Sequence, residues 1–89
     1  MPTLDPDRQV VNEEFNLVVA INLRNLRADH CVTLAQVAKA ADMDLTVLSR
    51  IESAQRSIKL REATAIAEFL GVDLDRIYKK QRGVVYEWA

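Results

Sequence analysis

Apolar residues recur every three or four positions along most of this chain, which is the spacing of helices with one buried face. The first apolar stripe consists of Phe15, Val18, Val19, Leu23 and Leu26. It predicts a helix that ends near Asp29 or His30. Asp5 followed by Pro6 is a favourable helix start, so residues 1–14 are expected to form either a helix extension or an N-terminal arm.

Two short helices are predicted next, separated by a tight turn. Thr33 and Gln36 have the spacing of a capping box, in which each side chain accepts a hydrogen bond from the backbone of the other residue. The apolar face of this helix comprises Leu34, Val37, Ala38 and Ala41. Asp42 interrupts the pattern, and Asp44 can cap a third helix that runs to about Ala54. The inward side of that helix carries Leu48 and Ile51.

The rest of the chain continues the helical spacing and then abandons it. A fourth stripe consists of Leu60, Ala63, Ile66, Ala67 and Leu70. Gly71 is expected to end that helix in the left-handed conformation, and Asp73 to cap a fifth helix. The inward residues of the fifth helix are Leu74, Ile77 and Tyr78. Residues 83–89 are apolar and rich in strand-forming types, so we expect an all-α domain of five helices with a short extended C-terminal tail over residues 81–89.

Length and composition narrow the class of protein. A chain of 89 residues makes one small domain, and two Gly with two Pro disfavour an all-β fold with many tight turns. The longest apolar run, from Leu17 to Ile21, is far shorter than the roughly 20 residues that cross a bilayer, and the N-terminus lacks a signal-peptide pattern. Cys31 has no second cysteine to pair with. We therefore expect a cytoplasmic protein without membrane association.

Catalysis and metal binding are not expected. A structural zinc site needs about four ligands, and Cys31 with the only histidine, His30, supplies two at best. Adjacent residues on a helix point in different directions, so His30 is badly placed to activate Cys31 as a nucleophile. A chain this short also has little interior in which to form a catalytic cleft. We expect neither an enzyme nor a cofactor.

The net charge of −1 conceals a basic central region. Residues 16–61 contain seven Lys and Arg against four Asp and Glu, whereas acidic residues are in excess on either side. Such an excess points to nucleic acid only if the basic side chains converge on one face of the fold.

The second and third predicted helices carry the main indication of function. A turn of three or four residues joins them, which is the arrangement of a helix-turn-helix, whose second helix enters the major groove of DNA. Ala38 is small enough to let the two helices approach closely, and Met43 can fill the space beneath the turn. Helical bundles also contain such tight corners, so this pattern alone leaves a purely structural turn open.

Several segments of the chain keep a common spacing. They are Leu26-Arg27, Val32-Thr33, Val37-Ala38, Met43, Leu48-Ser49-Arg50-Ile51-Glu52 and Ala67-x-x-Leu70-Gly71-Val72-x-Leu74-x-x-Ile77. In this combination the chain from Leu26 to Tyr78 resembles the lambda-repressor-like (Xre/Cro) helix-turn-helix family. The resemblance implies a five-helix DNA-binding domain, here over residues 15–80, in a transcriptional repressor or activator that is usually a dimer.

The resemblance also implies roles for individual residues. Arg27 and Glu52 correspond to a partly buried ion pair, and we expect Glu52→Ala to cost about 3–5 kcal/mol of stability. The positions of the base readers are Leu45, Thr46, Ser49 and Arg50. Thr46 can bond a base edge, and Arg50 can grip guanine through two hydrogen bonds. DNA phosphate contacts are expected from Thr33, Gln36, Gln55, Arg56, Ser57 and Lys59. Solvated side chains without a DNA role are expected at Lys39, Arg24 and Arg61.

The chain departs from the family at several positions. Glycine is common where this chain has Cys31, Asp42 and Ala54, and proline often stands where it has Ile58. Leu34 replaces a glutamine that usually touches phosphate, and with Leu45 and Val47 it makes the expected DNA face more apolar. For Leu45, contact with a thymine methyl and contact with protein both remain open.

The tail, residues 81–89, needs a partner because a single short strand is not stable alone. That partner is either the body of the domain or a second copy of the chain. We expect a dimer contact, since many DNA readers of this kind bind two half-sites as two-fold dimers. The residues expected to form it are Val84, Val85, Tyr86 and Trp88.

Two functions from different classes follow. The first is a sequence-specific, double-stranded DNA-binding transcriptional regulator, a homodimer that reads a short palindromic operator through the helix starting near Leu45. The second is a protein-interaction module, such as an antiactivator, antitoxin or accessory subunit, whose apolar face binds a toxin or another regulator. The basic residues from Gln55 to Lys59 favour the first function, and the apolar cluster Leu34, Leu45 and Val47 favours the second.

Overall fold

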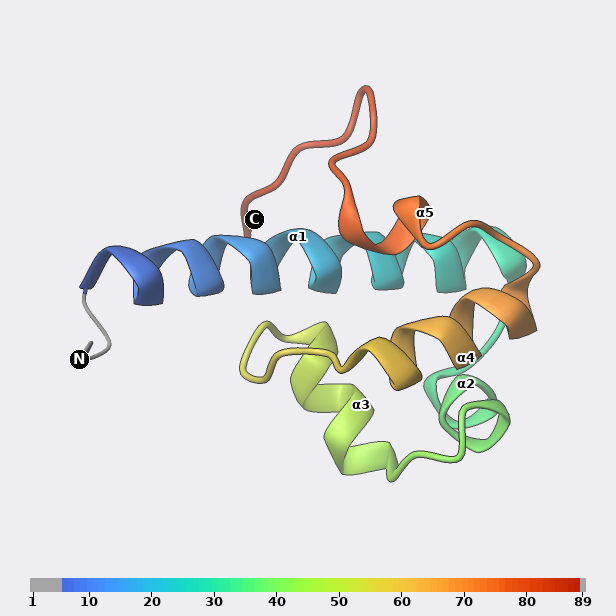
Figure 1. Ribbon diagram of the computed structural model, residues 1–89. Coiled ribbons are helices and arrows are strands. Elements are labelled where there is room, and N and C mark those ends of the chain that lie inside the picture. Colours follow the sequence, from blue (N-terminus) through green and yellow to red (C-terminus); the bar gives the residue numbers. More distant parts are fainter. Residues whose placement is uncertain (1–5, 89) are drawn as a thin grey trace.

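The computed structural model describes the backbone of residues 6–88 and the side chains from residue 13 onward. Its helices are α1 (Pro6–His30), α2 (Leu34–Ala40), α3 (Leu45–Glu52), α4 (Leu60–Leu70) and α5 (Asp75–Tyr78), and no strand occurs within the described range. In Figure 1, α2, α3 and α4 lie on one side of the long α1, and α5 with the tail lies on the other. The expected all-α fold of five helices is confirmed.

Helix α1 is the longest element and begins at Pro6. Proline suits the first turn of a helix because its backbone nitrogen has no hydrogen that would need a partner there. The proposed cap, Asp5, lies outside the described residues. The first turns of α1 project beyond the other helices in Figure 1, so the segment that follows Pro6 extends the helix.

The start of α2 is the capping box expected from the sequence. Thr33 Oγ1 accepts from the Gln36 backbone N–H at 3.0 Å, and Gln36 Oε1 accepts from the Thr33 backbone N–H at 2.7 Å. The position expected for the cap of α3 is confirmed, whereas the position expected for the cap of α5 is wrong. Asp44 occupies the capping position of α3, but its exposed carboxylate makes no capping bond, and α5 is capped at Leu74 rather than Asp73.

The first four helices all end in the same motif. In each, one residue just beyond the helix has a positive φ. Cys31 (54°) and Gly71 (70°) directly follow α1 and α4, and Asp42 (54°) and Ala54 (62°) stand two positions after the last residues of α2 and α3. The next residue donates its N–H to a carbonyl five positions earlier, through the pairs Val32–Arg27, Met43–Ala38, Gln55–Arg50 and Val72–Ala67 at 2.8–3.1 Å. This is the Schellman motif, which satisfies carbonyls that have no partner within the helix. Only one of the four uses glycine, the residue that adopts this conformation without steric cost.

The core lies where α1 meets the other four helices. Its largest fully buried members are Leu23, Leu26, Leu48, Ile51, Ile66, Ile77, Val19 and Val37. Two expected core positions are wrong, because Phe15 of α1 is 37% exposed and Leu60, the first residue of α4, is 65% exposed. Ile58, two positions earlier in the connection, is buried instead and closes that edge of the core.

The tail does not form the expected strand. It turns back onto α1, and its end lies against the middle of that helix in Figure 1. The Tyr86 hydroxyl accepts from the Gln81 backbone N–H at 2.7 Å and donates to Asn22 Oδ1 at 2.6 Å. Side-chain hydrogen bonds to α1 therefore hold the tail, where a strand would have needed a backbone partner.

Candidate nucleic-acid interface

One side of α3 is buried and the other faces solvent. Leu48 and Ile51 are 0% and 1% exposed and point into the core. The residues on the opposite side are exposed and comprise Leu45, Thr46, Ser49 and Arg50. Leu45 and Thr46 lie one helical turn before Ser49 and Arg50. A single face of α3 therefore carries all the expected base readers.

The turn between α2 and α3 is compact because the residues that pack around it are small and buried. Ala38 and Ala41 are 3% and 1% exposed, and the Met43 N–H donates to the Ala38 carbonyl at 2.8 Å. Asp42 takes the positive φ that glycine often supplies at this point. The geometry therefore has the two short packed helices and tight turn of a helix-turn-helix.

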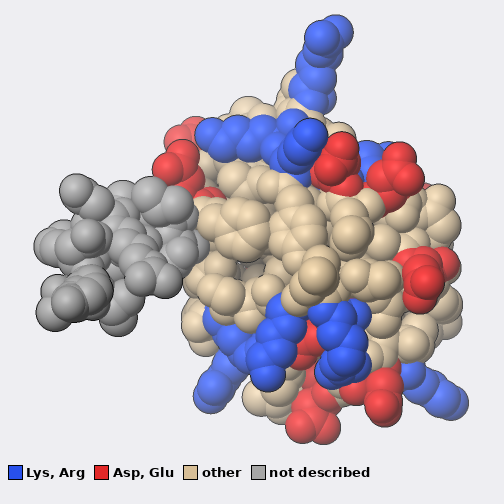
Figure 2. Space-filling model, viewed as in Figure 1, with Lys and Arg blue, Asp and Glu red and all other residues tan. Residues whose placement is uncertain are grey.

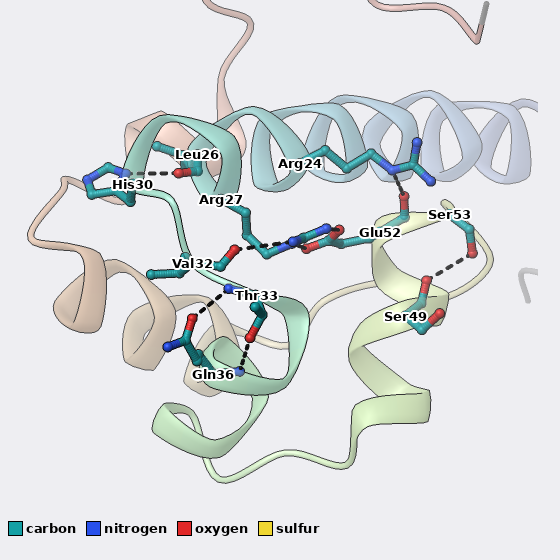
Figure 3. A network of polar contacts seen from close by, with 10 residues as sticks. All are labelled: Arg24, Leu26, Arg27, His30, Val32, Thr33, Gln36, Ser49, Glu52 and Ser53. Atoms are coloured by element: carbon teal, nitrogen blue, oxygen red, sulfur yellow. Dashed lines mark hydrogen bonds and ion pairs between the residues drawn. The ribbon is translucent and has the colours of Figure 1, made fainter.

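Two arginines of α1 hold the C-terminal end of α3 through the same residue. Arg27 makes a two-point ion pair with Glu52, with Nε–Oε2 at 2.7 Å and Nη2–Oε1 at 2.9 Å. Arg24, one turn earlier, donates from Nε to the Glu52 carbonyl oxygen at 2.9 Å. Figure 3 shows both side chains reaching from α1 to α3. The hydrogen bond to Glu52 raises the pKa of Arg27.

The loop between α3 and α4 is fastened by its own polar residues. Arg56 Nη1 bonds Glu62 Oε1 at 3.0 Å and the Ser57 carbonyl at 3.2 Å. The Ser57 hydroxyl donates to Asn16 Oδ1 at 2.8 Å. Two of the expected phosphate contacts are therefore engaged with the protein itself, while Gln55 and Lys59 are exposed.

Glu62 is the carboxylate that fixes this loop, and its side chain is 5% exposed. Burial alone would raise the pKa of Glu62, but hydrogen bonds from Arg56 and from the Lys59 backbone N–H outweigh that effect, and its pKa is lowered. The ionised form is thus the stable one in the fold.

Lys and Arg side chains gather around this part of the molecule. Figure 2 shows them along the lower part of the face in view, where Figure 1 places α3, the loop that follows it and the start of α4. Acidic side chains lie between and below them in the same view. An uncharged area separates them from the acidic and basic residues higher on the same face. The basic central region of the sequence thus contributes to one side of the fold.

Two of the three residues in the apolar cluster that was expected to favour a protein partner pack against the core. Leu34 and Val47 are half-buried and pack against core residues, whereas Leu45 is 49% exposed. Of the three residues, only Leu45 is an exposed apolar side chain on the outer face of α3.

Sequence reasoning missed the roles of two residues. Arg24 was expected to be solvated without a structural role, but it bonds α3. Glu62 was given no role, but it holds Arg56. A signal was present for each, since Arg24 and Arg27 share one helix face and Glu62 stands among the buried positions of α4.

Comparison with known proteins agrees with this geometry. The chain matches the Helix-turn-helix family model over residues 23–77, which covers more than half of it. It therefore belongs to the lambda-repressor-like (Xre) helix-turn-helix family, a family of DNA-binding regulators. No curated protein and no solved structure matches the chain.

The described part of the chain contains neither a group of side chains suited to a metal ion nor a helix suited to crossing a membrane. No three His, Cys, Asp or Glu side chains there are grouped so that they could hold a metal ion. None of the helices in that range combines the length and the apolar character needed to cross a membrane.

Proposed function

We propose that this chain is a sequence-specific transcriptional regulator that reads a short palindromic operator in double-stranded DNA as a homodimer. The observation that carries the proposal is the outer face of α3, where Thr46, Ser49 and Arg50 are exposed on a helix whose other face is locked into the core. Such a helix can enter the major groove without rearrangement of the domain.

The base-reading roles follow from side-chain chemistry. Arg50 carries the donors that pair with O6 and N7 of guanine, and Thr46 and Ser49 carry hydroxyls that bond either donors or acceptors. Leu45, at the start of α3, suits contact with a thymine methyl. Together they would read adjacent bases from one helix face.

The phosphate-contacting roles divide between two segments. Thr33 and Gln36 lie exposed at the start of α2, and Gln55 and Lys59 lie exposed in the loop after α3. Arg56 and Ser57 of the same loop bind protein groups, so in the proposal their main effect is to hold the loop in place for its neighbours. Phosphate contacts of this kind set the register of α3 on the duplex.

The dimer in the proposal forms through the tail. Val85 and Trp88 are 69% and 48% exposed, and Val84 is half-buried. Tyr86 supports this surface from below, because its hydroxyl is bonded to α1. Deletion of residues 83–89 should then give a monomer with weak operator affinity, and an unchanged dimer in light scattering would remove the tail from the interface.

In this proposal the chain is a cytoplasmic DNA-binding protein that has no enzymatic activity and needs no cofactor. The alternative, a module that binds a toxin or another regulator, depends on an apolar face. Since Leu34 and Val47 pack against the core, Leu45 alone offers little area for such a partner.

A salt titration separates the two functions. Wild-type protein is titrated onto labelled duplex from upstream of its own gene, at several salt concentrations. A dimer with about six to ten phosphate contacts should lose about 10³–10⁵ in affinity between roughly 50 and 200 mM salt. Absence of binding at the lowest salt would favour a protein partner.

A further inference from the structure

The tail reaches α1 through two aromatic residues, and the first of them anchors it on the side of α5. The Tyr86 hydroxyl donates to Asn22 Oδ1, and Asn22 is 2% exposed. The Asn22 amide in turn donates to the Ile77 carbonyl at 2.9 Å and to the Lys79 carbonyl at 2.8 Å. One buried asparagine therefore joins α1, α5 and the tail.

The second aromatic residue lies two positions further on and contacts a different side of α1. The Trp88 ring centroid is 5.2 Å from Cζ of Arg24, which is a cation–π distance. The same guanidinium group donates from Nε to the carbonyl of Glu52, the last residue of α3. The tail thus crosses α1 from α5 to the end of the helix that carries the base readers.

A cation at this point has a physical effect on α3. The last carbonyls of a helix lack partners within it and carry partial negative charge, so a guanidinium group stabilises them. Holding a long arginine side chain in one rotamer costs conformational entropy. A ring stacked on Arg24 restricts that side chain before it meets Glu52 and so lowers the cost of the contact.

We propose that Trp88 and Arg24 are positioning residues for α3, so that docking of the tail fixes the last turn of the DNA-reading helix within the same chain. The effect on DNA rests on the proposed function, whereas the effect on α3 stands without it. Tail and reading helix are then coupled inside one subunit, whether or not the tail also meets a second copy.

Amide hydrogen exchange of the wild-type chain and its variants tests the coupling. The backbone N–H groups of Ser53, Ala54 and Gln55 donate into the last turn of α3 and report its opening. Trp88→Ala should speed their exchange about two- to fivefold, the range that a partly exposed cation–π contact supports. Trp88→Phe should restore most of the protection because it keeps an aromatic face.

Two further variants sharpen the exchange test. Glu87→Ala is the matched control, since Glu87 is an exposed tail residue outside the proposed dimer contact, and its exchange pattern should equal that of wild type. Arg24→Gln should speed exchange about tenfold or more, because a charge-assisted hydrogen bond is lost. Adding Trp88→Ala to Arg24→Gln should then change nothing further. Unaltered exchange at the three amides in Trp88→Ala would overturn the proposal.

DNA affinity is measured on a duplex that the wild-type protein selects from a random-sequence library. Trp88→Ala should weaken binding by the same factor of about two to five. Faster exchange with unchanged affinity, or a changed oligomeric state in light scattering with unchanged exchange, would overturn the role in positioning. If wild type selects no duplex while Trp88→Ala still speeds exchange, the coupling stands and the proposed DNA function fails.

Discussion

Arg27 and Glu52 are 25 positions apart in the sequence, and their side chains meet in a two-point ion pair between α1 and α3. The two sides of this pair are buried to different degrees, with 27% of the Arg27 side chain exposed and 5% of the Glu52 side chain. Helix α3 is therefore fixed to α1 by a nearly buried carboxylate whose partner is still partly exposed to water.

This difference predicts unequal effects of removing the two partners. Arg27→Ala leaves a buried carboxylate without its ion pair and should cost about 3–5 kcal/mol of unfolding free energy. Glu52→Ala leaves an arginine that water can partly solvate, so its cost should be lower, about 2–3 kcal/mol. Urea denaturation at neutral pH measures both values. Losses below about 1 kcal/mol in either variant would mean that the pair is a solvated surface contact.

The lowered pKa of Glu62 predicts a pH dependence of stability. The unfolded chain binds a proton at this group near the ordinary value of 4.5, and the folded chain only below it. The stability from ionised Glu62 is therefore fully present above pH 4.5 and is lost as the pH falls through the folded value. The gap in unfolding free energy between wild type and Glu62→Gln should shrink from pH 7 toward pH 3. A gap that stays constant would contradict the contribution of the Arg56 pair.

The left-handed end of α3 predicts a stabilising substitution. Ala54 has φ of 62°, a conformation that costs a residue with a Cβ about 1–2 kcal/mol. Glycine removes this strain but adds unfolded-state entropy, so Ala54→Gly should stabilise by about 0.5–1 kcal/mol in thermal or urea unfolding. Ala28→Gly, at an exposed helical position of α1, is the control and should destabilise by about 1 kcal/mol. A destabilised Ala54→Gly would show that strain at Ala54 is not significant.

The buried hydrogen bonds of Tyr86 predict a marked effect of losing one oxygen atom. Tyr86→Phe leaves Asn22 Oδ1 and the Gln81 N–H without this partner, which should cost about 1–3 kcal/mol. Glu87→Ala, on the neighbouring exposed residue, should change stability by less than about 0.5 kcal/mol. Equal effects of the two variants would indicate that the tail is not anchored through the hydroxyl.

The fold could be predicted from the sequence because its signals are local. Apolar spacing identified each helix, Thr33 and Gln36 identified a capping box, and Gly71 identified a left-handed helix end. Asp42 stands where glycine is common in the family, and it adopts the left-handed conformation with φ of 54°. Helix caps and helix ends depend on the backbone geometry and side-chain chemistry of a few neighbouring residues, so the sequence reveals them.

Features that depend on distant residues could not be predicted in this way. The tail contains strand-forming residues, yet the hydroxyl of Tyr86 finds Asn22, 64 positions away, and holds the tail to α1. Leu60 fits the apolar stripe of α4 but stands at its first turn, where Ile58 already fills the core edge. Arg56 looked available for DNA because the position of Glu62 beside it follows only from the folded loop.

The site could be predicted as a helix face, since a helix buried on the side of Leu48 and Ile51 must expose Thr46, Ser49 and Arg50. The resemblance also implied the Arg27–Glu52 ion pair, which the structure contains, but the second contact with Glu52, from Arg24, could not be predicted. Arg24 and Arg27 converge on Glu52 only because α1 packs against α3 at that level. Their convergence depends on the angle and position at which the two helices cross. The apolar spacing within each helix does not determine that geometry.

The central claim is that the exposed face of α3 reads bases, and Arg50 tests it most directly. Affinities of wild type, Arg50→Ala and Lys59→Ala are measured on a selected duplex and on single-base variants of it, across salt concentrations. Arg50→Ala should remove about 1–3 kcal/mol of discrimination at one base pair of each half-site, while Lys59→Ala should weaken all sequences alike and lower the salt slope by about one. If Arg50→Ala binds every duplex as wild type does, with the same preferences, then α3 does not read DNA.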